Sequence, residues 1–163
     1  MYPVAVRILG VDVGRRRIGL AVSDASAVVA RPWRMLPAGE SPRASADRVA
    51  AVLSELDDPL EDRAGVGAIV VGLPRRLDGS DTDMTTLARE MASALHALTG
   101  LDVHLQDERL TSREAEARLA EREPDWRRRK RVLDAASAAI ILQDYLDQQA
   151  SGRATDVHGR AGA

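Results

Sequence analysis

The first forty residues alternate between short apolar runs and turn residues. Residues 4–13 form an apolar run rich in β-branched side chains, which predicts a buried strand. A polar turn at residues 14–17 leads into a second apolar run at residues 18–22, so the two strands are predicted to form an antiparallel hairpin. Residues 28–36 predict a third strand, and Pro32 places it at an edge of the sheet.

The middle of the chain alternates between helical and strand patterns. Ser41-Pro42 supplies an N-cap and a proline suited to the first helical position, and apolar residues follow at helical spacing to Leu56. Residues 65–73 are continuously apolar, which is typical of an interior parallel strand covered on both faces. A polar loop at residues 75–83 is then predicted, followed by a helix over residues 84–98 that ends at Gly100.

The last third of the chain predicts one more strand and two helices. Residues 101–105 form a short strand, and Thr111 and Glu114 have the spacing of a capping box at a helix start. Pro124 ends that helix, and residues 132–146 predict a final, alanine-rich helix. Three antiparallel strands followed by helix-linked strands indicate an α/β fold with a mixed five-stranded sheet flanked by helices.

Length and composition favour one globular domain. The chain has 163 residues, 45% of them hydrophobic and 29% charged, so we expect a single domain over residues 1–149 and a flexible tail over residues 150–163. There is no apolar run of eighteen residues and no signal-peptide pattern, which predicts a cytoplasmic protein without a membrane partner.

The absence of some residue types excludes several kinds of site. There is no cysteine, which excludes disulfides, thiol nucleophiles and cysteine-bound metals, and the three histidines are scattered along the chain. The chain has no phenylalanine, and with only two Trp and two Tyr an aromatic platform for single strands is not expected. The net charge of −2 argues against a uniformly basic nucleic-acid binder, although 22 of the 23 basic residues are Arg, which suits phosphate recognition.

Acidic residues occur at three informative places. Asp12 ends the first strand, Asp107 and Glu108 follow the strand at residues 101–105, and Asp134 begins the last helix. If the first and last strands are parallel neighbours, Asp12 and Glu108 lie at one edge, and a packed helix can add Asp134. Three converging carboxylates repel one another unless a cation neutralises them, and an all-oxygen site suits Mg²⁺ or Mn²⁺. Each acid alone also fits an ordinary role, such as a turn, a helix-dipole contact or an ion pair.

Basic residues cluster beside these acids. Three runs lie next to a predicted strand end or acid, and Arg109 follows Glu108 directly. The runs are Arg15, Arg16 and Arg17; Arg75 and Arg76; and Arg127, Arg128, Arg129, Lys130 and Arg131. A polyanion needs cations near the reacting phosphate, so we expect these residues to bind a nucleic-acid backbone. Any single run also fits a solvated loop.

Four segments resemble the motifs of the RuvX family, also called YqgF. They are Asp12-Val13-Gly14-x-x-Arg17-Ile18-Gly19-x-Ala21-x-Ser23-Asp24; Val70-Val71-Gly72-Leu73-Pro74 with Asp78-Gly79-Ser80; Asp107-Glu108-Arg109-Leu110-Thr111-Ser112; and Asp134-x-x-Ser137-Ala138-Ala139-x-Ile141-Leu142-Gln143-x-Tyr145-Leu146. They occur in the family's order and cover about residues 7–147. Arg76 stands where family members often have Asn, which affects the expected substrate contact of that loop but not the acids.

The resemblance implies a ribonuclease H-like fold and a nuclease related to Holliday junction resolvases of the RuvC type. It implies Asp12, Glu108 and Asp134 as the catalytic and metal-binding acids, with Asp107 ranked below Glu108. Mg²⁺ or Mn²⁺ is the implied cofactor, and the implied substrates are the 5′ end of precursor 16S rRNA and branched DNA. Junction cleavage needs two active sites, so that substrate predicts a homodimer.

Two other classes of protein remain as alternatives at this stage. Actin-like ATPases and sugar kinases also carry Asp-x-Gly on a first strand, but they need two such domains and a longer chain. A non-catalytic module that binds ribosomal RNA or the transcription machinery would use the same fold, although the three acids argue against it.

Overall fold

The computed structural model describes residues 6–57, 65–108 and 125–159. Five strands form one sheet in the order β3-β2-β1-β4-β5. Their bounds are β1 Arg7–Val13, β2 Arg17–Ser23, β3 Ala30–Pro37, β4 Val66–Leu73 and β5 Asp102–Asp107. β1, β2 and β3 are antiparallel neighbours, whereas β4 runs parallel to both β1 and β5, which confirms the predicted mixed sheet.

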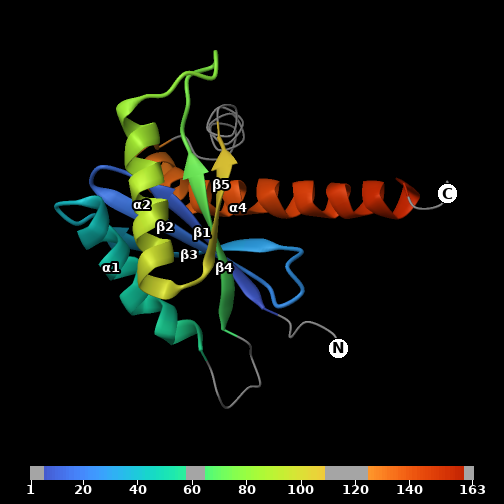
Figure 1. The fold of residues 1–163 in the computed structure, drawn as a ribbon. Helices are drawn as coiled ribbons and strands as arrows, with labels where there is room; N and C mark the ends of the chain where they lie inside the picture. Colours follow the sequence, from blue (N-terminus) through green and yellow to red (C-terminus); the bar gives the residue numbers. More distant parts are fainter. Residues whose placement is uncertain (1–5, 58–64, 109–124, 160–163) are drawn as a thin grey trace.

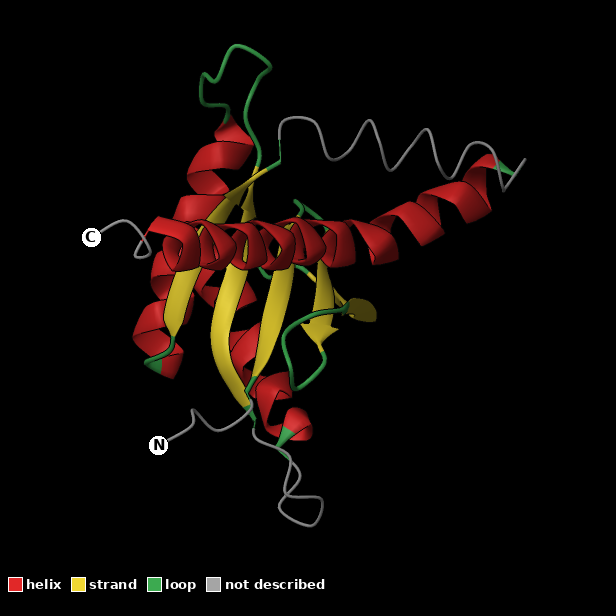
Figure 2. Ribbon diagram, turned by 90° about the vertical axis from the view of Figure 1, so that its right-hand side faces the viewer, coloured by secondary structure: helices red, strands yellow, loops and turns green. Residues whose placement is uncertain are grey.

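Helices cover both faces of this sheet (Figure 2). α1 Pro42–Leu53, followed by the short 3-10 helix η1 Ser54–Leu56, and α2 Asp83–Thr99 pack on one face, and α4 Trp126–Gly159 crosses the other. The larger core lies under α1 and α2, and the smaller core lies under α4. Within the described residues, no helix combines the length and the apolar character needed to cross a membrane.

The predicted start of α1 and the predicted end of α2 are confirmed, and a cap at Thr82 that was not predicted starts α2. The Ser41 hydroxyl accepts from the Ala44 N–H at 3.0 Å, and Pro42 occupies the first turn. Thr82 and Thr85 cap each other's backbone at the start of α2. Gly100 ends α2 with φ of 69°, a left-handed conformation that glycine adopts without strain.

The last helix is longer at both ends than the alanine-rich pattern predicts. The sequence predicts residues 132–146, whereas α4 begins at Trp126 and ends at Gly159. The Asp125 carboxylate accepts from the Arg127 N–H at 2.9 Å, and Arg has a high helix propensity, so the basic run continues the helix. Helical backbone also extends past residue 149; the division into a domain and a flexible tail stays a prediction.

α4 packs closely on the sheet because β1 carries a glycine beneath it. A Cβ atom at Gly10 would lie 2.8 Å from Leu142 Cβ and 3.0 Å from the Ala138 carbonyl oxygen. Ala138 and Leu142 are fully buried there. The carboxyl ends of β1, β4 and β5 therefore lie beside α4, which is the place where the sequence predicts the acids. The helix predicted to start at Thr111 lies outside the described residues.

Candidate active site

Asp12 and Glu108 meet across a glycine of the strand that separates them. The first and last strands are not the direct neighbours that the sequence left open as a condition: β4 lies between β1 and β5. Asp12 alternates with Val11 and Val13, which belong to the core under α1 and α2, so its side chain faces α4. Glu108 follows β5 directly, and its Oε2 atom lies 2.9 Å from the Cβ position of Gly72 on β4.

Gly72 is the residue that sequence reasoning missed as part of this site. Any side chain there would meet Glu108 and also Ile141 of α4, whose Cδ1 atom lies 2.6 Å from the same Cβ position. The available signal was a glycine within an otherwise apolar buried strand, which often marks a close approach of another group. Gly72 leaves the space that the Glu108 carboxylate fills beneath α4.

The electrostatics of Glu108 indicate crowded negative charge. Burial, together with the negative charges of Asp12 and Asp107, raises its pKa from the ordinary 4.5 to about 8. The Glu108 backbone N–H donates to the Leu73 carbonyl at 3.3 Å, so the residue is fixed at the end of β4. A cation beside Asp12 and Glu108 would offset both the burial and the repulsion, so this donor set fits a hard divalent ion.

Asp107 ends β5, so the strand runs two residues further than predicted and includes this acid. It pairs in register with Leu73 of β4, and its Oδ2 atom lies 3.9 Å from Arg75 Nη1. The side chains of successive strand residues point to opposite faces, which separates Asp107 from the face that holds Glu108. The lower rank of Asp107 as a metal ligand stays a prediction.

Asp134 does not begin the last helix, contrary to the sequence prediction. It lies eight residues after Trp126, within α4, because the basic run before it is helical. It precedes Ala138 by four residues, about one helical turn, and the Ala138 carbonyl lies against Gly10. Among residues whose side chains the structure describes, no three acids or histidines form a metal-binding group; the Asp134 side chain is outside that set.

The predicted phosphate-binding arginines of the β1–β2 turn are exposed at the same end of the sheet. Arg15, Arg16 and Arg17 lie next to the end of β1, where Asp12 is. Arg15 Nη2 is 3.8 Å from Asp83 Oδ2 at the start of α2, and both side chains are mostly exposed, so this ion pair adds little stability.

The arginines after β4 are already engaged within the protein. Arg75 Nε lies 3.5 Å from Asp81 Oδ1, and the Arg75 side chain also reaches Asp107. Arg76 Nη1 donates to the Asp81 carbonyl at 3.1 Å and to Ser80 Oγ at 3.4 Å. The expected polar loop is therefore an ordered hairpin whose cations have internal partners.

The remaining predicted basic residues are described in part. Arg127 is exposed in the first turn of α4. Arg128, Arg129, Lys130 and Arg131 continue this helix, which replaces the expected loop, and only their backbone is described. Arg109 lies outside the described residues.

Comparison with known proteins agrees with the motifs. The family described as "RuvX: Holliday junction resolvase" matches residues 6–148. A protein of Pelotomaculum thermopropionicum named as a pre-16S rRNA nuclease is 37% identical over 91% of this chain and 91% of its own length. A protein of the same name from Anaeromyxobacter dehalogenans is 42% identical over 89% of this chain and 99% of its own length.

A solved structure is also similar. RuvC of Thermus thermophilus in complex with Holliday junction substrate is 16% identical, with a TM-score of 0.44, over 83% of this chain and 91% of that one. The mixed sheet and its strand order are those of the ribonuclease H-like fold that the motifs imply. With the family match covering residues 6–148 and relatives above 30% identity over most of the chain, this protein belongs to the RuvX family.

Proposed function

We propose that this protein is an endonuclease that hydrolyses phosphodiester bonds in structured nucleic acid. The observation that carries the proposal is the approach of the Glu108 carboxylate to Gly72, on the face where Asp12 also points. Two carboxylates gathered at the carboxyl ends of the strands on either side of β4, with exposed arginines beside them, suit a reaction on a phosphate backbone. The family description and the names of the relatives, both of which refer to nucleases or resolvases, support this reading.

The divalent cofactor is part of the proposal. Asp12 and Glu108 would hold Mg²⁺ or Mn²⁺, and Asp134 of α4 is proposed as the third acid. When bound, such an ion activates a water and stabilises the leaving oxygen. The protein supplies the rest: Gly72 makes room for Glu108, which lies close enough to Asp12 for a bound cation to offset their mutual repulsion.

The basic residues at this end of the sheet are proposed to position the substrate. Arg17 and its neighbours in the β1–β2 turn are exposed, as is Arg127 at the start of α4. Arg75 and Arg76 would have to exchange internal partners for a phosphate, so their contribution to binding is expected to be smaller. Arg109 and residues 128–131 complete the proposed set.

The proposed substrates are the 5′ end of precursor 16S rRNA and branched DNA. The first follows the names of the relatives, and the second follows the family description. Resolution of a junction needs two active sites, so for that substrate we propose a homodimer. Sedimentation of the protein alone and on junction DNA tests it, and a monomer in both states argues against junction resolution.

A cleavage assay with both substrates side by side tests the function. The wild-type protein is compared with Asp12→Asn and with Asp47→Asn, an equivalent change at an exposed acid of α1 that pairs with Arg43. We expect metal-dependent cleavage by the wild type and by Asp47→Asn, and a loss of about a hundredfold or more for Asp12→Asn. Equal cleavage by Asp12→Asn refutes the mechanism, and rescue of a deletion strain by that variant favours a non-catalytic binding module.

A further inference from the structure

Residues 74–82 form a projecting hairpin, here called the finger, beside the proposed active site. Figure 1 shows it rising from the carboxyl end of β4, beyond the top of α2. It starts directly after Leu73, whose carbonyl accepts from the Glu108 N–H, and it ends at the N-cap of α2. The base of the finger is therefore continuous with the strand end against which Glu108 lies.

Hydrogen bonds close the finger on itself. The Arg76 N–H donates to the Ser80 carbonyl at 3.0 Å, and the Gly79 N–H donates to the Arg76 carbonyl at 2.8 Å. Gly79 has φ of 86°, and the Asp78 carboxylate accepts from the Ser80 N–H at 2.8 Å, which fixes the turn. These contacts define one conformation of the tip.

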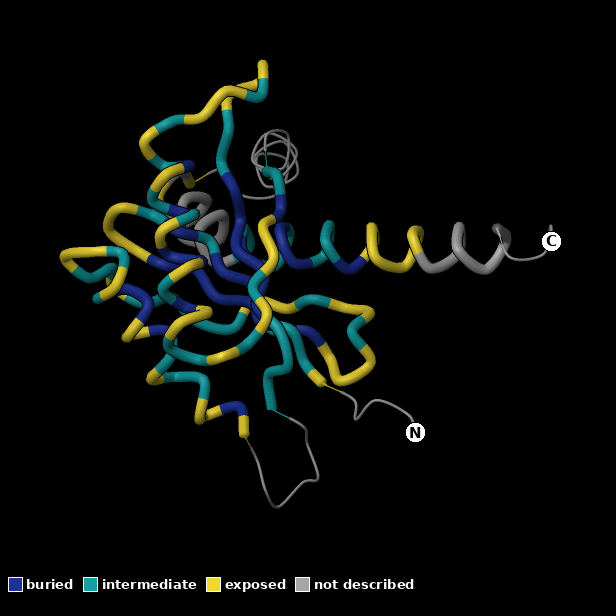
Figure 3. The backbone as a smooth tube through the Cα atoms, viewed as in Figure 1, coloured by how far each residue is buried: buried dark blue, intermediate teal, exposed yellow. Residues whose placement is uncertain are grey.

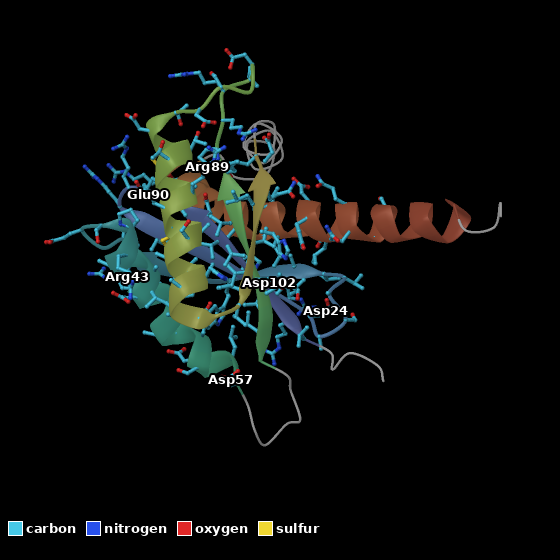
Figure 4. The ribbon with its side chains drawn as sticks, in the orientation of Figure 1. Asp24, Arg43, Asp57, Arg89, Glu90 and Asp102 are labelled. Carbon is cyan, nitrogen blue, oxygen red and sulfur yellow. The ribbon has the colours of Figure 1, made fainter. Side chains whose placement is uncertain are left out.

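The finger is also attached firmly at its base. Arg75 and Asp81 form a β-bridge across it, and the Thr85 hydroxyl of α2 donates to the Pro74 carbonyl. Arg89 of α2 holds Asp81 through an Nη1–Oδ2 contact of 2.9 Å, and Figure 4 labels this arginine on α2 below the finger. A rigid projection can transmit a force to a bound strand, whereas a loose loop cannot.

The charges of the finger cancel one another. Arg75 and Arg76 are matched by Asp78 and Asp81, and both arginines contact partners within the finger or at its base. An element of this kind gains little from phosphate neutralisation, which is the main source of salt-dependent affinity. Its contact with a nucleic acid must therefore use something other than charge.

The tip offers an apolar side chain instead. Leu77 is 56% exposed, and Figure 3 shows the tip region largely in the colour of exposed residues. The other large exposed apolar side chains among the described residues lie on β5 or at the end of the sheet where β1 begins and β2 ends, far from the finger. Apolar side chains on rigid supports are used by nucleic-acid-binding proteins as wedges that separate stacked bases.

We propose that Leu77 is a wedge that unstacks bases at a discontinuity of the helix, such as a branch point or a single-strand–duplex boundary. The proposal rests on the proposed nuclease function and adds a specificity-determining residue to it. The finger would hold the strand open next to the acids, so that the scissile bond lies at a defined distance from the discontinuity. Leu77 positions the substrate and takes no part in the chemistry.

Fluorescence of 2-aminopurine placed at the discontinuity reports this unstacking without cleavage. The probes are a four-way DNA junction and a precursor rRNA hairpin, each with the Asp12→Asn protein so that the substrate stays intact. Adding Leu77→Ala to the Asp12→Asn protein should reduce the fluorescence rise about fivefold or more, because the side chain that holds the base step open is removed. The salt dependence of the dissociation constant should stay unchanged, because leucine carries no charge and releases no counterions.

Two further variants make the result decisive. Leu105→Ala removes another exposed leucine, 43% exposed on β5, and should leave the fluorescence rise unchanged. Leu77→Trp should restore the rise, since an aromatic ring can also insert between bases. An undiminished rise with Leu77→Ala overturns the proposal, as does a loss that Leu77→Trp fails to restore.

Cleavage assays separate this proposal from the nuclease function. With Asp12 intact, Leu77→Ala should cut the substrate that the wild type cuts about tenfold more slowly. A wild-type protein that cuts neither substrate refutes the nuclease function. A wild type that cuts, with Leu77→Ala equally fast, refutes only the wedge.

Discussion

Replacement of Gly72 by alanine tests the geometry of the proposed site directly. The added Cβ would lie 2.6 Å from Ile141 Cδ1 and 2.9 Å from Glu108 Oε2. Ordinary contacts between such atoms are about 3.5 Å or longer, so Ile141 must move by roughly 1 Å and the carboxylate by roughly half that. Both atoms end flexible side chains, which allows the fold to adapt.

The expected cost is therefore larger for activity than for stability. Overpacking of a core by one methyl group costs about 1–3 kcal/mol of unfolding free energy. Because the Ile141 and Glu108 side chains can move away, we expect Gly72→Ala to cost about the lower value. A catalytic group displaced by up to about 1 Å loses as much as a hundredfold in rate. We expect Gly72→Ala to unfold at slightly lower urea concentration and to cleave between about tenfold and a hundredfold more slowly.

A double variant separates the two contacts. Ile141→Val removes the Cδ1 atom, which alone costs about 1 kcal/mol of stability. Combined with Gly72→Ala, it removes the clash with α4 but leaves the clash with Glu108, so stability should recover while activity should not. Urea unfolding and cleavage rates at saturating Mg²⁺ are the measurements. Gly72→Ala with wild-type cleavage refutes the reasoning, and recovery of both properties in the double variant assigns the effect to α4 packing.

Three other changes give simpler tests. Gly100→Ala forces an alanine to adopt a φ of 69°, with no neighbouring atom in the way of its Cβ. The unfolding free energy should fall by about 1 kcal/mol while the cleavage rate stays unchanged, and an unchanged urea midpoint contradicts this. Asp24 accepts from the Ser26 hydroxyl and from the N–H groups of Val29 and Val28, and these bonds lower its pKa from 3.8 to about 2. The ionised Asp24 carboxylate therefore stabilises the fold fully above its ordinary pKa, and this contribution is lost as pH falls towards 2. The difference in unfolding free energy between the wild type and Asp24→Ala, measured in urea, should shrink over that interval, and a constant difference contradicts this. Neutralising residues 127–129 should weaken nucleic-acid binding and flatten its salt dependence, and unchanged binding returns them to a solvated surface.

Several elements follow from the sequence because their signals are local. The apolar runs of β1, β2 and β4 are long enough to identify strands, and the caps of α1 and α2 use neighbouring residues. The start of α4 was missed because the pattern of apolar residues weakens in the basic run. The Asp125 cap and the high helix propensity of Arg decide the boundary there, and neither depends on apolar periodicity.

The hairpin at residues 74–82 shows a second limit. Its composition predicts a polar loop whose two arginines, Arg75 and Arg76, bind the substrate backbone. The tertiary structure pairs Arg75 with Asp81 and Asp107, and Arg89 of α2 completes the arrangement. Only Asp107 is distant along the chain from its partner; the other contacts form because the segment closes into a hairpin against α2, which composition alone does not specify.

The sequence by itself pointed to Asp12 and Glu108 as candidate acids and predicted the strands that they follow or end. Asp12 and Glu108 stand at the ends of apolar runs, and the cost of burying an unpaired carboxylate marks such positions locally. Only the tertiary structure decided how the two approach each other. β4 enters between β1 and β5, and the lack of a side chain at Gly72 lets Glu108 reach the face to which Asp12 points. Strand order and close packing arise from contacts between distant segments, so the pattern of any one segment cannot specify them.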